Sequence, residues 1–150
     1  MDQQAKGLNN INLVTPTMYA YQIIQALKIA KSNGLHIPVI YNTNGYENVE
    51  TIKMLDGYID VYLPDLKYYS NELSTKYSKA DNYFKITTTA IQEMQTQVGN
   101  PVFDDNGIIQ KGVIIRHLVL PNHIQNSKHI LKWIKENMPK GTYVSVMAQY

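Results

Sequence analysis

An acid and a base stand two residues apart near the middle of the chain. Asp65 and Lys67 follow a predicted strand at residues 58–63, which Pro64 ends. In an extended segment, side chains two residues apart point the same way. Lys67 would then hold a ligand carboxylate, and Asp65 would bind hydroxyl groups or a cation. The simpler alternative is a solvated salt bridge at the end of a strand.

Two other segments carry polar groups that could bind a ligand. Asn42 and Thr43 open the loop at residues 42–45, where the Asn-Gly dipeptide is also compatible with a plain turn. Arg116, the only arginine, lies inside the apolar strand predicted at residues 113–120. A charge there must be paired or must face a polar cavity. Its guanidinium suits either a ligand carboxylate or a structural ion pair.

The elements that must position these residues alternate between strands and helices. Apolar runs and turn residues predict five main strands, at residues 11–14, 37–41, 58–63, 113–120 and 142–147. Helical spacing predicts helices at residues 19–32, 49–55, 81–98 and 126–138. Residues 102–103 and 108–109 predict a small hairpin within 101–112.

This alternation predicts an α/β fold with a parallel sheet. Ligands of such folds bind at the carboxyl ends of the strands. Asn42, Thr43, Asp65 and Lys67 lie there, as do residues 15–17 and 149–150. A closed eightfold barrel takes about 250 residues. The chain is therefore either a small open domain or a piece of a barrel, and its two ends favour the piece.

Composition narrows the possible functions. The 150 residues allow one domain, and 44% hydrophobic with 17% charged residues exclude a disordered tail. A net charge of +2 does not suggest nucleic acid or a membrane surface as a partner. The absence of cysteine excludes disulfides, a cysteine nucleophile and an iron–sulfur cluster held by this chain's own thiolates. With no signal peptide or long apolar run, we expect a cytoplasmic protein.

Five ordered blocks of sequence resemble one family. They are NINLVTPT at residues 10–17, VIYNTNGYE at 39–47, DVYLPDLKY at 60–68, IRHLVLP at 115–121 and YVSVMAQY at 143–150. Together they resemble the radical S-adenosylmethionine (SAM) proteins similar to pyruvate formate-lyase activating enzyme. The resemblance covers nearly the whole chain.

The resemblance implies a partial parallel (β/α) barrel, a fragment of a (β/α)6 barrel, and a SAM-dependent reaction. In this family a [4Fe-4S] cluster, held by a C-x-x-x-C-x-x-C loop, cleaves SAM reductively and yields a 5′-deoxyadenosyl radical. The electron comes from a reductant such as flavodoxin or ferredoxin. The radical takes a hydrogen atom from a substrate, which for activating enzymes is a glycine of a glycyl radical enzyme.

The same resemblance implies a set of SAM-binding residues. Lys67 matches the family lysine that contacts the SAM carboxylate, and Asp65 matches the acid near the ribose and a cation site. Asn42 and Thr43 match the strand-end pair beside the methionyl group. Arg116 matches an arginine that projects into the cavity. The resemblance assigns no catalytic residue and no metal ligand to this chain.

The chain also departs from the family pattern. Residues 15–17 replace the G-G-E segment that binds the SAM amino group in many relatives, and the three cysteines are missing. We therefore expect residues 1–150 to be a single partial barrel domain, truncated at both ends and inactive alone. Unpaired edge strands would favour self-association.

Two alternatives of other classes remain open. A barrel lyase would use Lys67 as a Schiff-base nucleophile, which requires an apolar pocket around that lysine. A non-catalytic α/β module would bind a nucleotide or a protein partner.

Overall fold

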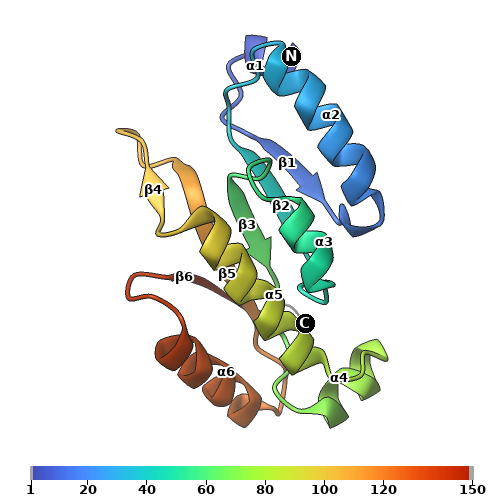
Figure 1. The fold of residues 1–150 in the computed structure, drawn as a ribbon. Helices are drawn as coiled ribbons and strands as arrows, with labels where there is room; N and C mark the ends of the chain where they lie inside the picture. Colours follow the sequence, from blue (N-terminus) through green and yellow to red (C-terminus); the bar gives the residue numbers. More distant parts are fainter. Residues whose placement is uncertain (1, 149–150) are drawn as a thin grey trace.

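The protein contains a single mixed β-sheet. Its structure is a computed structural model, which describes residues 2–148. The six strands are β1 (Ile11–Val14), β2 (Val39–Thr43), β3 (Val61–Pro64), β4 (Val102–Phe103), β5 (Ile109–Leu118) and β6 (Tyr143–Met147). They lie in the order β1-β2-β3-β5, and β5 also pairs with β4 and β6 (Figure 1). Every pairing is parallel except that of β4 with β5.

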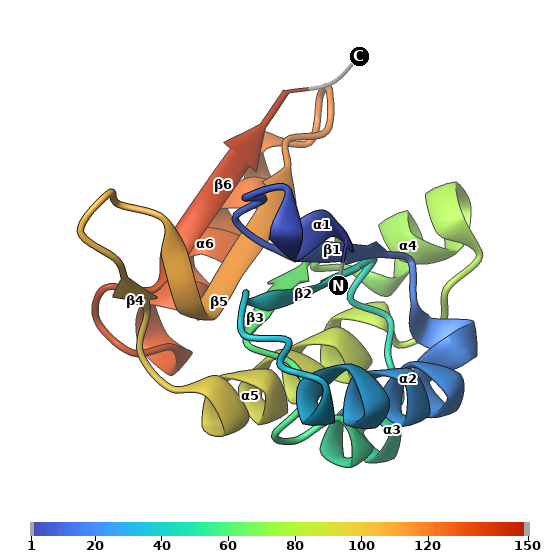
Figure 2. The same ribbon diagram turned by 90° about the horizontal axis from the view of Figure 1, so that it is seen from above.

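Four of the helices cover one side of this sheet. The helices are α1 (Asp2–Ala5), α2 (Ala20–Ser32), α3 (Val49–Met54), α4 (Asn71–Ser78), α5 (Tyr83–Val98) and α6 (Ile124–Asn137), with a 3-10 turn η1 (Thr17–Tyr19) before α2. Figure 2 shows α2, α3 and α5 beneath the curved sheet and α6 alongside β5 and β6. The opposite, concave side carries none of these four helices. Strand-end residues can therefore face an open surface.

The helices form where apolar residues recur at helical spacing. In α2, Ala20, Ile24 and Leu27 are buried at positions i, i+4 and i+7. In α5, Ala90 and Met94 belong to a longer buried stripe. These stripes pack on the sheet because burying an aliphatic side chain stabilises the fold by roughly 1.5–3 kcal/mol.

Alternation along each strand sorts side chains between the two sides of the sheet. Tyr41, Tyr62 and Ile115 belong to the core between sheet and helices. The residues next to them face the concave side. Arg116 pairs in register with Ser145 of β6, and it forms a β-bridge with Asp65 just beyond β3. The register therefore aligns three polar residues in one row on the concave side.

The parallel α/β arrangement predicted from the sequence is confirmed, as is the hairpin. The two predicted strand segments at residues 108–109 and 113–120 are one continuous strand, β5. Helix α4 was not predicted. Ser74 is its only buried residue, so its sequence shows no apolar stripe at helical spacing. Within residues 2–148, β1 pairs only with β2 and β6 only with β5, so the described sheet is open.

None of the helices in residues 2–148 combines the length and the hydropathy that a membrane span requires.

Candidate functional site

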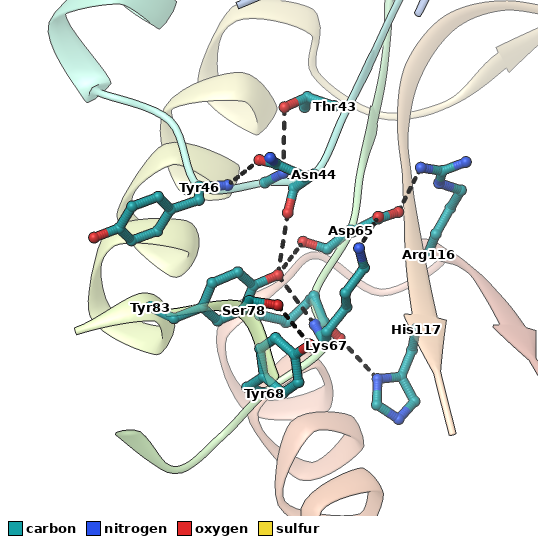
Figure 3. Close-up of polar contacts among 12 residues, drawn as sticks. Thr43, Asn44, Tyr46, Asp65, Lys67, Tyr68, Ser78, Tyr83, Arg116 and His117 are labelled. Carbon is teal, nitrogen blue, oxygen red and sulfur yellow. Dashed lines mark hydrogen bonds and ion pairs between the residues drawn. The ribbon is translucent and has the colours of Figure 1, made fainter. Parts of the chain in front are cut away.

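One buried carboxylate joins two cations at the carboxyl edge of the sheet. Asp65 Oδ2 lies 2.9 Å from Lys67 Nζ, and Asp65 Oδ1 lies 2.5 Å from Arg116 Nη2 (Figure 3). The Asp65 side chain is 8% exposed, whereas Lys67 and Arg116 are 27% and 28% exposed. Two positive charges and one negative charge leave this group with a net charge of +1. We call these three residues the Asp65 cluster.

The cluster retains unused hydrogen-bond donors. An ammonium group has three N–H donors and a guanidinium has five, so one ion pair each leaves several of them free. Arg116 Nε is buried and has no hydrogen-bond partner among the described residues. A ligand that brings a carboxylate or phosphate oxygen would satisfy the exposed donors of Lys67 and Arg116 and balance the net positive charge.

The backbone between Asp65 and Lys67 is fixed by side chains from other elements. The hydroxyl of Tyr83, on α5, accepts a hydrogen bond from Lys67 N at 3.2 Å. The same hydroxyl lies 3.0 Å from Asp65 O and 3.2 Å from Asn44 O, and its single proton can serve only one of these carbonyls at a time. Burial raises the pKa of Tyr83, so the hydroxyl keeps that proton.

His117 fixes the peptide between the two charged residues. Its Nδ1 lies 2.7 Å from the carbonyl oxygen of Leu66, which only accepts, so Nδ1 must carry the hydrogen. Its Nε2 then accepts from Ser127 Oγ of α6 at 2.8 Å. The ring is completely buried, and burial lowers the pKa of His117, which favours this neutral form.

Helix α6 holds the loop at a second point. Asn126 Nδ2 donates to Lys67 O at 2.8 Å, and Asn126 Oδ1 accepts from Tyr69 N at 2.7 Å. Leu66 N donates to Arg116 O at 2.8 Å. Every peptide group that flanks Asp65 and Lys67 therefore has a partner. Such support is what a binding site needs to hold its side chains in one geometry.

Gly45 lets the loop after β2 touch the loop after β3. Its φ is +82°, and a Cβ atom at this position would lie 2.1 Å from Asp65 O and 2.8 Å from Thr87 Cγ2. No L side chain fits there, so the close approach requires glycine.

A second buried carboxyl supports the same edge from the helix-covered side. Glu47 is 1% exposed, and its Oε1 accepts hydrogen bonds from Thr17 Oγ1, at 2.6 Å, and from Thr43 Oγ1. Its Oε2 and the Tyr41 hydroxyl have no hydrogen-bond partner among the described residues. Burial raises the pKa of Glu47, and the hydroxyl donors partly offset that shift.

The structure brings together three of the five predicted site residues, Asp65, Lys67 and Arg116. Asn42 is half-buried and aligned in register with Leu63, two residues before Asp65, so it faces the same side. Thr43 faces the other side of the sheet, where its hydroxyl is committed to Glu47. The strand-end segment at residues 149–150 lies outside the described residues.

Sequence reasoning missed the residues that support the site. The sequence places Tyr83, Asn126 and Ser127 only within predicted helices, at residues 81–98 and 126–138. For His117 a signal was available: it follows Arg116 in a strand, so the two side chains had to face opposite sides of the sheet. Among the described residues, no group of three or more His, Asp or Glu side chains could hold a metal ion.

Comparisons with known proteins show a related fold and one relative. No family model matches the sequence. An uncharacterized protein of Methanocaldococcus jannaschii is 36% identical over 146 residues, which are 94% of this chain and 37% of that protein. The chain thus spans little more than a third of the length of this relative.

A solved structure shares the fold over most of the chain. It is the crystal structure of a domain of pyruvate-formate lyase-activating enzyme from Bacteroides vulgatus. The match has a TM-score of 0.51 and 13% sequence identity, and it covers 92% of this chain and 97% of the other. At this identity the likeness shows an α/β fold similar to that domain, without assigning an activity.

Proposed function

We propose that this chain is part of a radical SAM protein similar to pyruvate formate-lyase activating enzymes, and that its Asp65 cluster binds SAM. The five sequence blocks support the proposal, and the fold of the activating-enzyme domain agrees with it. In this interpretation the open sheet is part of a (β/α) barrel, and its concave side is the barrel interior.

The observation that carries the proposal is the bridging of two cations by one buried carboxylate. Asp65 neutralises one of the two charges of Lys67 and Arg116, and the other remains available at the strand ends. SAM carries an amino-acid carboxylate, which matches this surplus charge. A ligand with no anionic group would leave the cluster positive and its donors unused.

Each residue has a role in this proposal that follows from its contacts. Lys67 and Arg116 bind the SAM carboxylate through N–H groups not directed at Asp65. Asp65 holds both cations in place and offers its oxygens to ribose hydroxyls. Asn42 offers a carboxamide from the neighbouring row of the concave side. Thr43 does not face the ligand in this proposal. It supports the site from the helix-covered side of the sheet, where its hydroxyl donates a hydrogen bond to Glu47.

The residues of this chain do not fit a [4Fe-4S] cluster. Such clusters are held by cysteine thiolates, and the sequence contains no cysteine. SAM binding at the Asp65 cluster is therefore the step that we propose for this chain. A glycyl radical enzyme is the protein partner that the activating-enzyme likeness suggests, and a flavodoxin or ferredoxin the reductant.

Calorimetric titration with SAM tests the proposal. We expect Lys67→Met and Arg116→Gln each to weaken binding about 10- to 150-fold, the equivalent of roughly 1.5–3 kcal/mol for one charge-assisted hydrogen bond. Either variant leaves Asp65 paired with the other cation, so the fold should survive. Circular dichroism would confirm this.

Lys53→Met is the matched control. Lys53 is exposed and pairs with Glu50 on α3, away from the strand ends, so this variant should bind SAM like the parent protein. Equal affinity of the Lys67, Arg116 and Lys53 variants would refute the proposal, as would undetectable SAM binding by the folded parent chain.

The Schiff-base alternative receives less support. A nucleophilic lysine of that kind is activated in an apolar pocket or beside a second cationic group. Lys67 Nζ is instead in an ion pair with Asp65 at 2.9 Å. Borohydride trapping with a carbonyl compound should therefore leave Lys67 unmodified. A non-catalytic module would use the same cluster to bind an anionic partner, and SAM titration separates that function from the proposed one.

A further inference from the structure

A small cavity lies beside Lys67, and Asp65 is not part of its lining. It has a volume of about 200 Å³ and lies between the loops after β2 and β3 and the junction of α4 with α5. Its lining consists of Asn44, Tyr46, Lys67, Tyr68, Ser78, Lys79, Ala80 and Tyr83. We call it the Lys79 pocket. Pockets for whole drug-sized ligands usually measure about 300–1,000 Å³, so this one has room for a single functional group.

The polar groups around the pocket are mainly hydrogen-bond donors. Two lysines line it, and no aspartate or glutamate does. Asn44 Oδ1 already accepts from Tyr46 N at 2.9 Å, which leaves the Asn44 amide nitrogen as the group available to a ligand. The carbonyl of Asn44 lies within reach of the Tyr83 hydroxyl. The lining therefore matches an acceptor that carries negative charge.

The walls of the pocket are built from packed aromatic rings. Tyr46 stacks on Tyr83 with ring centroids 6.0 Å apart, and Tyr68 meets Tyr83 edge-on at 5.1 Å. The Tyr68 hydroxyl is hydrogen-bonded to Ser78 Oγ at 2.7 Å. These contacts hold the pocket in shape without any ligand.

Lys79 has a left-handed backbone conformation, which is unfavourable for a residue with a side chain. It ends α4 with φ +51° and ψ +34°, the left-handed region. Helices that end in this way usually place glycine or asparagine there, because a Cβ atom is strained in that region. Among the described residues, Lys79 has no ion-pair partner that would compensate for the strain. Strain of this kind concentrates at functional sites.

We propose that the Lys79 pocket binds an oxyanion, the carboxylate or phosphate group of a small molecule or peptide. The ammonium of Lys79 and the amide of Asn44 hold the anion at the rim. Lys67 belongs to both the lining of this pocket and the Asp65 cluster, and it contributes positive charge to each. The inference is independent of SAM binding, because Lys79 and Asn44 do not belong to the Asp65 cluster.

Titration by 15N–1H NMR with inorganic phosphate, and separately with acetate, tests the inference. We expect saturable shifts of the backbone amides of Asn44, Lys79 and Ala80 with at least one of the two anions. Saturation by phosphate alone identifies a phosphate site, and saturation by acetate identifies a carboxylate site. If neither anion gives saturable shifts at these amides, the inference is wrong.

Two substitutions at Lys79 separate binding from folding. Lys79→Met and Lys79→Gly should each raise the dissociation constant of the anion at least fivefold. Lys79→Gly should also melt at the same temperature as the parent or above it, since glycine relieves the left-handed strain. Loss of affinity in a variant that is no less stable than the parent is not explained by a structural role.

Lys76→Met is the matched control. Lys76 lies on the same helix, with its ammonium 5.2 Å from the ring centroid of Tyr77, and does not line the pocket. This variant should change the anion affinity less than twofold. Equal losses in the Lys76 and Lys79 variants would overturn the inference. SAM titration of Lys79→Met, expected to match the parent, shows whether a failure concerns this pocket or the proposed function.

Discussion

Replacing Glu47 by glutamine exchanges one oxygen atom of a buried carboxyl group for an NH₂ group. Glu47 Oε1 accepts hydrogen bonds from Thr17 and Thr43, and its Oε2 and the Tyr41 hydroxyl lack partners. In Glu47→Gln, the amide oxygen can still accept from both threonines, and the buried group carries no charge at any pH. The variant therefore keeps the link between the loop after β1 and the end of β2.

The effect on stability depends on pH, with a definite sign. Burial raises the pKa of Glu47 in the folded protein above the value of about 4.3 in the unfolded chain. The stability that comes from the protonated carboxyl is therefore complete below about pH 4.3, and it is lost as the pH rises through the folded pKa. Glutamine does not titrate, so it avoids this loss.

We expect Glu47→Gln to exceed the parent protein in unfolding free energy by at least about 1 kcal/mol at pH 8, because a neutral amide costs less to bury than an ionised carboxylate. The advantage should shrink toward pH 4.3. Glu47→Ala should lose about 2 kcal/mol or more at every pH, because it leaves the hydroxyls of Thr17 and Thr43 without their acceptor.

Urea unfolding of the three proteins between pH 4.5 and pH 8.5 measures these differences. In a protein of this size, 1 kcal/mol corresponds to roughly 2–4 °C in melting temperature, which thermal unfolding would resolve. A constant difference between the parent and Glu47→Gln across this range would refute the reasoning, since it would show that the Glu47 carboxyl does not titrate there with a raised pKa.

Two further substitutions test the support of the loop after β3. Replacing His117 by Phe leaves Leu66 O and Ser127 Oγ without this partner, and we expect a loss of about 2–3 kcal/mol in urea unfolding. Because burial lowers the pKa of His117, its contribution is present above about pH 6.5 and is lost as the pH falls through the folded pKa, so the variant should lack this slope. Gly45→Ala should be destabilised by more than about 2 kcal/mol, because its Cβ collides with backbone. Gly34→Ala, with φ +91° and open space around the new Cβ, is its control and should lose about 1 kcal/mol; similar losses at both glycines would contradict the close approach.

The sequence predicts the sheet well because short-range patterns determine it. Strand β1 has the predicted bounds. The apolar face of α2 packs on the core as predicted, with Ile24 and Leu27 buried and with Ile23 and Ala30 half-buried. Helix α4 lacks such a stripe and is contacted by a distant part of the chain, since the Tyr77 hydroxyl is hydrogen-bonded to His123 Nε2, 46 residues away. The periodicity of apolar residues within a segment cannot predict contacts between residues that are far apart in the sequence.

The Asp65 cluster was partly predictable for the same reason. Strand ends that follow one another in a parallel sheet meet at one edge, which brought Lys67 and Arg116 together. Thr43 shows the limit of that rule: an alternating strand sends neighbouring residues to opposite sides, and its hydroxyl faces Glu47. The supporting contacts of Tyr83 and Asn126 cross 16 and 59 residues of sequence, and no local pattern encodes them.

A crystal structure of the chain with SAM tests the central claim most directly. We predict a methionyl carboxylate oxygen within about 2.7–3.2 Å of Lys67 Nζ or a guanidinium nitrogen of Arg116, with Asp65 still between the two cations. SAM bound elsewhere, or a carboxylate that contacts neither cation, would contradict it.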